Sequence, residues 1–196
     1  MLNIHSIPLG MLATNCYILR QGGSEHCIVI DPGQQPDDLL HYLERTGLTV
    51  DAILLTHGHF DHVGGVRQLV AEADCPVYVS REDLILPPRM TDGPLYYTDF
   101  YGEGSHLDLA GMAIDVIATP GHTPGSVCLL IEDCMFSGDT LFAGSCGRTD
   151  FPGGSMKQMY ASLERLAQLP GDYRVFPGHG ESTTLTAEKQ YNPYMN

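Results

Sequence analysis

The chain has 196 residues, of which 43% are hydrophobic and 17% are charged, a composition typical of a globular protein. This length suggests a single domain over residues 1–196, large enough to bury a core without disulfide bonds. With 24 acidic and 10 basic residues the formal net charge is −14, which argues against a nucleic-acid partner because such a chain repels phosphate backbones.

No apolar run approaches the roughly 18 residues of a transmembrane helix. The N-terminal residues lack the basic stretch, apolar run and small-residue cleavage site of a signal peptide, so we expect a cytoplasmic protein without a membrane partner. The six cysteines form no C-x-x-C pair. Four of them lie in apolar, strand-like runs, where a reduced cysteine behaves as a small hydrophobe: Cys16, Cys27, Cys128 and Cys134.

Short strands and turns dominate the first half of the chain. The residue pattern predicts a hairpin of Asn15–Leu19 and His26–Ile30, a helix over Pro36–Thr46 and a buried strand over Asp51–Leu55. A helix from about His62 to Ala71, a strand over Val77–Ser80 and a short helix over Arg81–Leu86 are expected to follow. The segment Pro87–Ser105 is less regular and rich in aromatic residues.

The second half continues with strands over Ala113–Ala118, Ser126–Ile131 and Cys134–Ser137. A helix over Met156–Gln168, with Ser155 as its N-cap, precedes a last strand over Arg174–Phe176. Strands outnumber helices and come in hairpins rather than in strict β-α-β alternation. This pattern favours two sheets with helices packed outside them.

The strongest functional signal is the segment His57-Gly58-His59-Phe60-Asp61-His62, which places four metal-ligand side chains within six residues, directly after an apolar strand. In an extended segment, residues i and i+2 point the same way, so His57 and His59 can hold one ion together. Asp61 and His62 lie where the chain turns into a helix and can reach a neighbouring point. Burying three imidazoles beside a carboxylate makes little sense without an ion.

Three more strands end in a Gly-containing turn that presents one ligand-type side chain: His122, Asp139 and His179. Seven candidate ligands exceed the three that a catalytic zinc ion takes from a protein. They suit two ions, the first held by His57, His59 and His122, and the second by Asp61, His62 and His179. The carboxylate of Asp139 can bridge the two ions.

These motifs carry a resemblance to a known family. The segments His57–His62 (HGHFDH), Thr119–Ser126 (TPGHTPGS), Ser137–Phe142 (SGDTLF) and Phe176–Gly180 (FPGHG) resemble the metallo-β-lactamase superfamily, and the match covers nearly the whole chain. Within it, the segments Gly147–Gly154 and Pro177–Thr184 resemble the small glyoxalase II-like hydrolases that lack a separate C-terminal helical domain. The resemblance implies an α/β fold, the αββα four-layer sandwich. It also implies the same ligand set, with zinc as the first choice of metal and iron or manganese as others.

The activity implied by the resemblance is hydrolysis of a small-molecule thioester of the hydroxyacylglutathione type. Two ions lower the pKa of a bound water towards about 7, which supplies a hydroxide nucleophile at neutral pH. Asp61, the candidate catalytic residue, is expected to orient this nucleophile. A nuclease is disfavoured because the chain has no room for an extra domain. A true β-lactamase is disfavoured by the bridging Asp139 and by the missing signal peptide.

Two other interpretations stay open. Persulfide dioxygenases share the fold and a Gly-Arg-Thr-Asp-Phe segment, but use a single iron on the equivalents of His57, His122 and Asp139. The other interpretation is a non-catalytic metal-binding module with a degenerate site, which the intact ligand set argues against.

Three roles stay open, two of them in the segment after Asp139 and one in the aromatic segment before it. Where glyoxalase II proper holds glutathione with a Lys and a Tyr, this chain has Arg148 and Asp150. Arg148 is therefore a candidate to hold a substrate carboxylate bidentately, or else it ties the loop together through Asp150. Cys146 is expected to pack rather than to react. The aromatic segment Tyr96–Tyr101 is either a wall over the site or part of the core.

Overall fold

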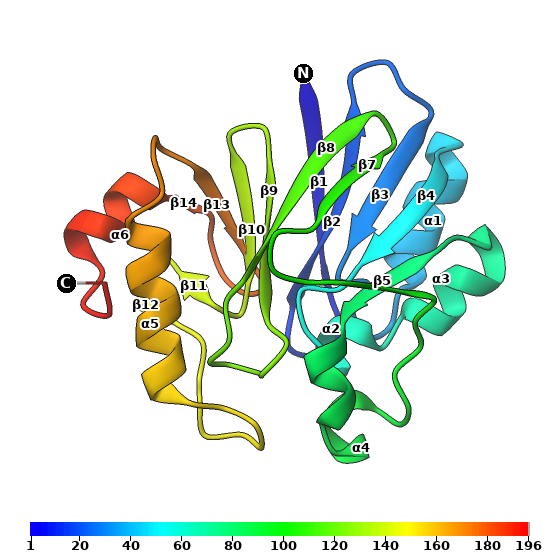
Figure 1. The fold of residues 1–196 in the computed structure, drawn as a ribbon. Coiled ribbons are helices and arrows are strands. Elements are labelled where there is room, and N and C mark those ends of the chain that lie inside the picture. Colours follow the sequence, from blue (N-terminus) through cyan, green and yellow to red (C-terminus); the bar gives the residue numbers. More distant parts are fainter. Residues whose placement is uncertain (196) are drawn as a thin grey trace.

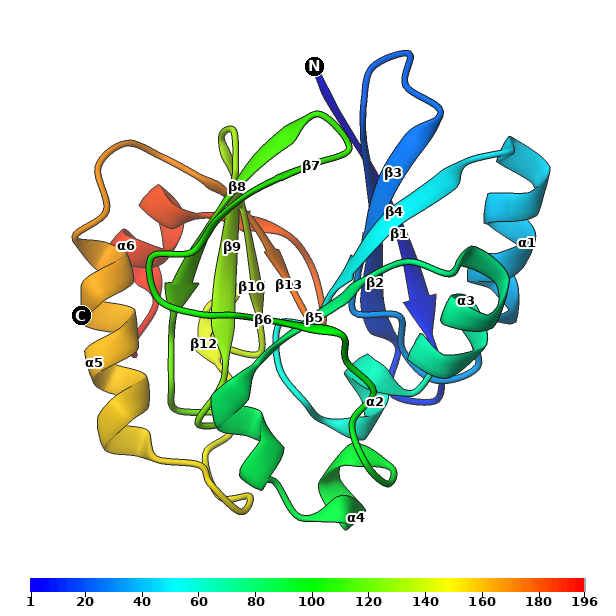
Figure 2. The ribbon, with the colours of Figure 1, turned by 45° about the vertical axis from the view of Figure 1, so that its right-hand side comes forward.

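Two six-stranded sheets lie face to face in the computed structural model of the chain, which describes residues 1–195. Helices α1 (Asp37–Thr46) and α3 (Val66–Ala73) cover the outer face of the first sheet (Figure 1). Helices α5 (Met156–Ala167) and α6 (Leu185–Tyr191) cover the second, as the turned view shows most clearly (Figure 2). The order of layers is helix, sheet, sheet, helix, so the predicted αββα sandwich is confirmed.

The first sheet comes entirely from the first half of the chain. Its strands follow in sequence order from β1 to β6, with antiparallel pairing from β1 to β3 and parallel pairing from β3 to β6. The strands are β1 (Leu2–Leu9), β2 (Thr14–Gln21), β3 (His26–Ile30), β4 (Thr49–Leu54), β5 (Val77–Ser80) and β6 (Asp99–Tyr101). Between them lie α2 (Phe60–Val63), the 3₁₀ helix η1 (Arg81–Ile85) and α4 (Pro88–Thr91).

The second sheet has the order β14-β13-β10-β9-β8-β7, in which only the β10–β13 pair is parallel. Its strands are β7 (His106–Leu109), β8 (Met112–Ala118), β9 (Val127–Ile131), β10 (Cys134–Gly138), β13 (Arg174–Pro177) and β14 (Thr183–Thr184). A small hairpin of β11 (Leu141–Phe142) and β12 (Ser145–Cys146) follows β10.

Three hydrophobic clusters hold the four layers together. Residues 27–30 of strand β3 are all apolar because both of their faces are buried. Ile28 and Ile30 pack between the sheets, whereas Cys27 and Val29 pack towards α1 and α3. Successive side chains of a strand point to opposite faces, and both faces of this strand are buried. The third cluster lies between the second sheet and α5, where Leu163 and Leu166 are fully buried.

Several elements differ from the prediction. Strand β1 was not predicted, because it lies at the edge of its sheet and only its end residues Leu2 and Leu9 are buried, which leaves no alternating pattern. The helix expected from His62 to Ala71 is divided into α2 and α3 at two glycines. A Cβ on Gly65 would lie 2.5 Å from the carbonyl oxygen of Gly33, so the chain passes too close there for a side chain. Strands β7, β11, β12 and β14 and helix α6 were also not predicted.

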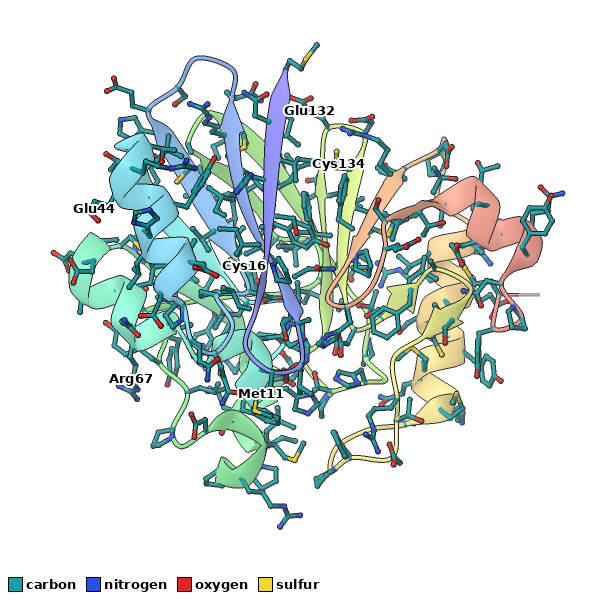
Figure 3. The ribbon with its side chains drawn as sticks, turned by 180° about the vertical axis from the view of Figure 1, so that it is seen from behind. Met11, Cys16, Glu44, Arg67, Glu132 and Cys134 are labelled. Carbon is teal, nitrogen blue, oxygen red and sulfur yellow. The ribbon has the colours of Figure 1, made fainter. Side chains whose placement is uncertain are left out.

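The cysteines are free, as expected, and five of the six are buried. Cys16 and Cys134 lie on strands of different sheets (Figure 3). Among residues 1–195, none of the helices combines the length and the apolar character that crossing a membrane requires.

Candidate metal centre

The seven predicted ligand residues lie together where strands of both sheets end. His57 to His62 follow β4 and lead into α2, at the lower end of the sheets in Figure 1. The other three come from the second sheet and follow β8, β10 and β13: His122, Asp139 and His179. Three sets with ligand atoms within 4.8 Å of one another can each hold an ion: His57, His59 and His122; His57, His62 and Asp139; and Asp61, His62 and His179.

The first set is made of three imidazoles. Nδ1 of His59 lies 2.8 Å from Nε2 of His122, and the ring of His57 lies 4.9 Å from the ring of His59. His57, His59 and His122 are 1%, 3% and 2% exposed, so very little of this set is in contact with bulk water. This is the set that the sequence assigns to the first ion.

The set that the sequence assigns to the second ion, Asp61, His62 and His179, contains the carboxylate of Asp61. Its Oδ2 lies 3.5 Å from Nε2 of His62 and 3.1 Å from Nε2 of His179. The turn that carries His179 passes close to this set, because a Cβ on Gly178 would lie 2.6 Å from Cε1 of His62. Oδ2 of Asp61 also accepts a hydrogen bond from Oγ1 of Thr14 at 3.1 Å, which fixes the carboxylate.

Asp139 lies between the set assigned to the first ion and the set assigned to the second ion. Its Oδ1 is 3.4 Å from Nε2 of His62, and its Oδ2 is 3.4 Å from Nε2 of His122 and 3.7 Å from Nε2 of His179. One oxygen therefore faces His62 and the other faces both His122 and His179. A carboxylate that bridges two ions needs this placement.

The hydrogen bonds of the histidines fit a metal centre. Nδ1 of His62 contacts Asp31, Nδ1 of His122 contacts the carbonyl oxygen of Arg148, and Nδ1 of His179 contacts that of Leu12. Metal-binding histidines in proteins hold their outer nitrogen in this way, which leaves the other nitrogen with a lone pair for the ion. Four buried atoms of the described residues have no hydrogen-bond partner: Nε2 of His57, His59 and His62, and Oδ1 of Asp139. Buried polar atoms without a partner are costly, and bound cations would satisfy those of His57, His62 and Asp139. For His59 the nitrogen that faces His122 is Nδ1, so its Nε2 is not the metal-facing atom.

The pKa shifts of His57, His59, Asp61 and Asp139 suit cation binding, whereas His62 has to lose a proton before it can bind an ion. Burial lowers the pKa of His57 well below its usual value and the pKa of His59 to about 3, so both imidazoles are neutral near pH 7. For His62 burial acts in the same direction, but Asp139 and Asp31 outweigh it and raise its pKa. Burial raises the pKa of the Asp61 and Asp139 carboxyls, yet the neighbouring histidines lower both below the usual value. A metal needs neutral imidazoles and ionised carboxylates as ligands.

Asp31 is a functional candidate that sequence reasoning missed. Its Oδ2 accepts hydrogen bonds from Nδ1 of His62 at 2.8 Å and from Oγ1 of Thr56 at 2.6 Å, while its Oδ1 accepts one from the Thr56 amide at 2.8 Å. Its backbone has φ = 49°, a left-handed conformation that is uncommon for a residue other than glycine. The signal was present in the sequence, because Asp31-Pro32-Gly33 also follows an apolar strand.

Asp83 is a second missed residue, and it joins the two loops that carry the first set. This fully buried carboxylate accepts hydrogen bonds from the amide of Gly58 at 2.7 Å, from the amide of Gly125 at 2.6 Å and from Oγ1 of Thr123 at 3.0 Å. Burial raises its pKa to about 6. An acidic residue in a short helix gives no sequence signal for such a role.

A cavity of about 490 Å³ is lined by five of the seven candidate ligands: His59, Asp61, His122, Asp139 and His179. Beyond the candidate ligands it is lined mainly by apolar side chains: Leu12, Phe60, Phe142, Cys146 and Phe151, together with Ser145 and Arg148. Met11, which is 92% exposed, lies beside Leu12 in the turn between β1 and β2 (Figure 3). Arg148 both lines the cavity and forms an ion pair with Asp150, so the structure contains both features that the sequence left open for it.

The aromatic segment Tyr96–Tyr101 does not line this cavity. Tyr101 is buried and donates a hydrogen bond to the carbonyl oxygen of Leu55 at 2.7 Å, whereas Tyr96 and Phe100 pack against the cluster under α1 and α3. The interpretation as a wall over the site is therefore wrong, and the core interpretation is confirmed for Tyr96, Phe100 and Tyr101, whereas Tyr97 is 39% exposed. Cys146 packs against the cluster at α5 while also lining the cavity.

Comparison with known proteins identifies relatives over the whole chain. Hydroxyacylglutathione hydrolase GloC of Haemophilus influenzae is 32% identical over 100% of this chain and 99% of its own. The crystal structure of the BLEG-1 B3 metallo-beta-lactamase matches with a TM-score of 0.90 and 35% identity, covering 99% of this chain and 100% of that chain.

Two further crystal structures are similar. TTHA1623 in a di-iron-bound form has a TM-score of 0.86 and 41% identity, covering 97% of this chain and 99% of that chain. ETHE1 from Myxococcus xanthus has a TM-score of 0.83 and 28% identity, covering 97% of this chain and 83% of that chain. Residues 9–179 match the family described as the metallo-beta-lactamase superfamily, and they contain all seven candidate ligands. The chain belongs to the metallo-beta-lactamase superfamily.

Proposed function

We propose that the protein is a dinuclear-metal hydrolase that acts on a small-molecule thioester. His57, His59 and His122 would hold one ion, Asp61, His62 and His179 the other, and Asp139 would bridge them. The observation that carries the proposal is the inward lone pairs of His62, His122 and His179, whose outer nitrogens are held by Asp31 and by backbone carbonyl oxygens. Zinc is our first choice of metal, although the similar TTHA1623 structure is described as di-iron-bound.

Bound divalent ions supply a nucleophilic water at neutral pH and polarise a carbonyl oxygen. The role of the protein's own side chains is to position the attacking water. Asp61, held by the hydrogen bond from Thr14 at 3.1 Å, is placed to orient the attacking water and to accept its proton. The apolar walls of the cavity limit access of bulk water, which strengthens the electrostatic interactions inside it.

A thioester is the preferred substrate class because a thiolate leaves with little protonation. The name of the GloC relative, a hydroxyacylglutathione hydrolase, supports this class. The similarity to BLEG-1, which is described as a B3 metallo-beta-lactamase, makes β-lactams a necessary comparison.

The test combines metal analysis with substrate assays on the purified, metal-loaded protein. We expect two ions per chain, and hydrolysis of S-lactoylglutathione or of simple acyl thioesters that stops on addition of a chelator. Hydrolysis of a cephalosporin with no thioesterase activity would overturn the thioester assignment. An inactive protein that binds two ions would favour the non-catalytic metal-binding module.

A mononuclear iron persulfide dioxygenase is the second candidate, favoured by the Gly-Arg-Thr-Asp-Phe segment. The arrangement of Asp61, His62 and His179, which offers a second set of ligands, argues for the hydrolase. A stoichiometry of one iron per chain, with oxygen consumption on a persulfide, would decide for the dioxygenase.

A further inference from the structure

The cavity over the metal centre contains little that could hold an anionic substrate. Apart from the candidate ligands, most of its lining side chains are apolar, and Arg148 is the only lining residue with a permanent positive charge. The formal net charge of −14 gives no long-range attraction to an anion. Away from the metal ions themselves, recognition of a substrate carboxylate at this site therefore depends on Arg148.

Arg148 is already engaged by a carboxylate of the same loop. Its Nε lies 2.7 Å from Oδ1 of Asp150, and its Nη2 donates to Oδ2 of Asp150 at 2.8 Å. This is the bidentate geometry in which a guanidinium binds a carboxylate best. Asp150 occupies the Nε–Nη2 edge of the guanidinium, so a substrate carboxylate has only the Nη1–Nη2 edge, where it shares Nη2 with Asp150 and is repelled by the charge of Asp150.

A second contact holds the guanidinium in place. Its carbon atom lies 3.9 Å from the ring centroid of Phe151, which itself lines the cavity. The Arg148 backbone is fixed as well, because its carbonyl oxygen contacts Nδ1 of His122 at 2.7 Å. Arg148 thus lines the cavity as a guanidinium that is paired with Asp150 and stacked on Phe151, rather than as a free cation.

We infer that Asp150 is a selectivity residue: by pairing with Arg148 it makes the cavity select neutral, apolar thioesters over those that carry carboxylates, such as glutathione conjugates. This inference rests on the proposed function for the reaction, but its geometry concerns ligand binding alone. Asp150 acts through Arg148 and by its own negative charge, and both effects disfavour an anionic ligand. The apolar lining of Leu12, Phe60, Phe142 and Phe151 takes the uncharged acyl or thiol group.

The test measures binding of two non-hydrolysable thioethers to the metal-loaded protein by calorimetry. S-hexylglutathione carries the glutathione carboxylates, and S-hexyl-N-acetylcysteamine has the same alkyl chain without charge. In Asp150→Asn the dissociation constant for S-hexylglutathione is expected to fall about three- to tenfold, as for the gain of one charge-assisted contact. The constant for the neutral thioether should change less than about twofold.

Two further variants separate this mechanism from a general effect of charge or folding. Asp133→Asn removes the same charge and frees Arg174, whose Nε lies 3.1 Å from Oδ2 of Asp133. It should affect neither ligand, because neither residue lines the cavity. In an Arg148→Gln background, the improvement that Asp150→Asn brings to binding of S-hexylglutathione should be clearly smaller, since only the direct repulsion by the Asp150 charge is then removed.

Unchanged binding of S-hexylglutathione in Asp150→Asn, or an equal gain in the Arg148→Gln background, would overturn the inference. So would wild-type protein that binds S-hexylglutathione much more tightly than the neutral thioether. None of these measurements requires turnover, so they stand apart from the hydrolysis assays that test the proposed reaction.

Discussion

Replacing Asp31 with asparagine tests whether the outer contacts of the histidines tune the metal centre. The wild-type carboxylate accepts three hydrogen bonds, from the amide and hydroxyl of Thr56 and from Nδ1 of His62. An amide has only one oxygen, so its NH₂ group must face a donor in either orientation. If that group faces His62, the imidazole has to carry its proton on Nε2, the atom that faces Asp61 and Asp139.

The expected cost follows from these contacts. A proton on Nε2 of His62 removes the lone pair that would bind the second ion, and the alternative orientation sets the NH₂ group against the Thr56 amide. Loss of such an outer contact typically reduces metal affinity about 10- to 100-fold. This corresponds to about 1.4–2.7 kcal/mol of binding free energy. The loss should fall mainly on the second ion, because His62 belongs to the set with Asp61 and His179.

The assay is a zinc titration in competition with a chromophoric chelator, which resolves the affinities of the two ions. Asp51→Asn is the matched control: its carboxylate lies 2.6 Å from Nδ1 of His26, but this pair is exposed and lies outside the candidate centre. Circular dichroism shows whether each variant is folded. If folded Asp31→Asn binds both ions within about twofold of wild type while Asp51→Asn behaves the same, Asp31 does not tune the centre.

Three other outcomes follow from the structure. Removal of the metal by a chelator should lower the melting temperature by about 10 °C, because saturating ions at a thousandfold excess over Kd contribute about 4 kcal/mol; an unchanged melting curve would contradict the ligand set. Asp139→Ala should reduce kcat at least about tenfold more than Arg148→Ala, whose effect should appear in KM; near-full turnover of Asp139→Ala with two bound ions would contradict the bridge. Burial raises the pKa of Asp83 to about 6, above the roughly 4 of an unfolded Asp, so its protonation stabilises the fold at low pH and this stability is lost as pH rises through 6. In urea unfolding of the metal-free proteins between pH 4 and pH 7, the free energy of unfolding of wild type should therefore fall by up to about 3 kcal/mol relative to that of Asp83→Asn. A difference between the two proteins that does not change with pH would contradict the raised pKa.

The sequence predicts much of the site because the chemistry is concentrated at strand ends. The segment His57–His62 is recognisable alone, and the strands before His122, Asp139 and His179 place those residues at the same edge. Asp31 follows a strand in the same way, but a single carboxylate before a proline has the pattern of an ordinary turn. Asp83 has no pattern at all, since only the folded chain brings it between the loops of Gly58 and Gly125.

The fold was predictable where strands are buried on both faces, as β3 and β4 are, because their apolar runs are continuous. Edge elements were not. Strand β7 alternates only between partly buried and exposed residues, and the two-residue strands β11, β12 and β14 are too short for any periodicity. Tertiary pairing rather than local residue preference forms these elements.

The division of the two sheets between the two halves of the chain has a consequence for biosynthesis. Strands β1 to β6 are complete at Tyr101, whereas all strands of the second sheet follow it. At roughly 5–20 residues per second, a ribosome needs roughly 5–20 s to make the second half. During that interval the apolar inner face around Ile28, Ile30 and Leu54 has no partner layer. An ion captured then by His57 and His59 lacks His122, so stable metal loading has to wait until the second sheet has docked.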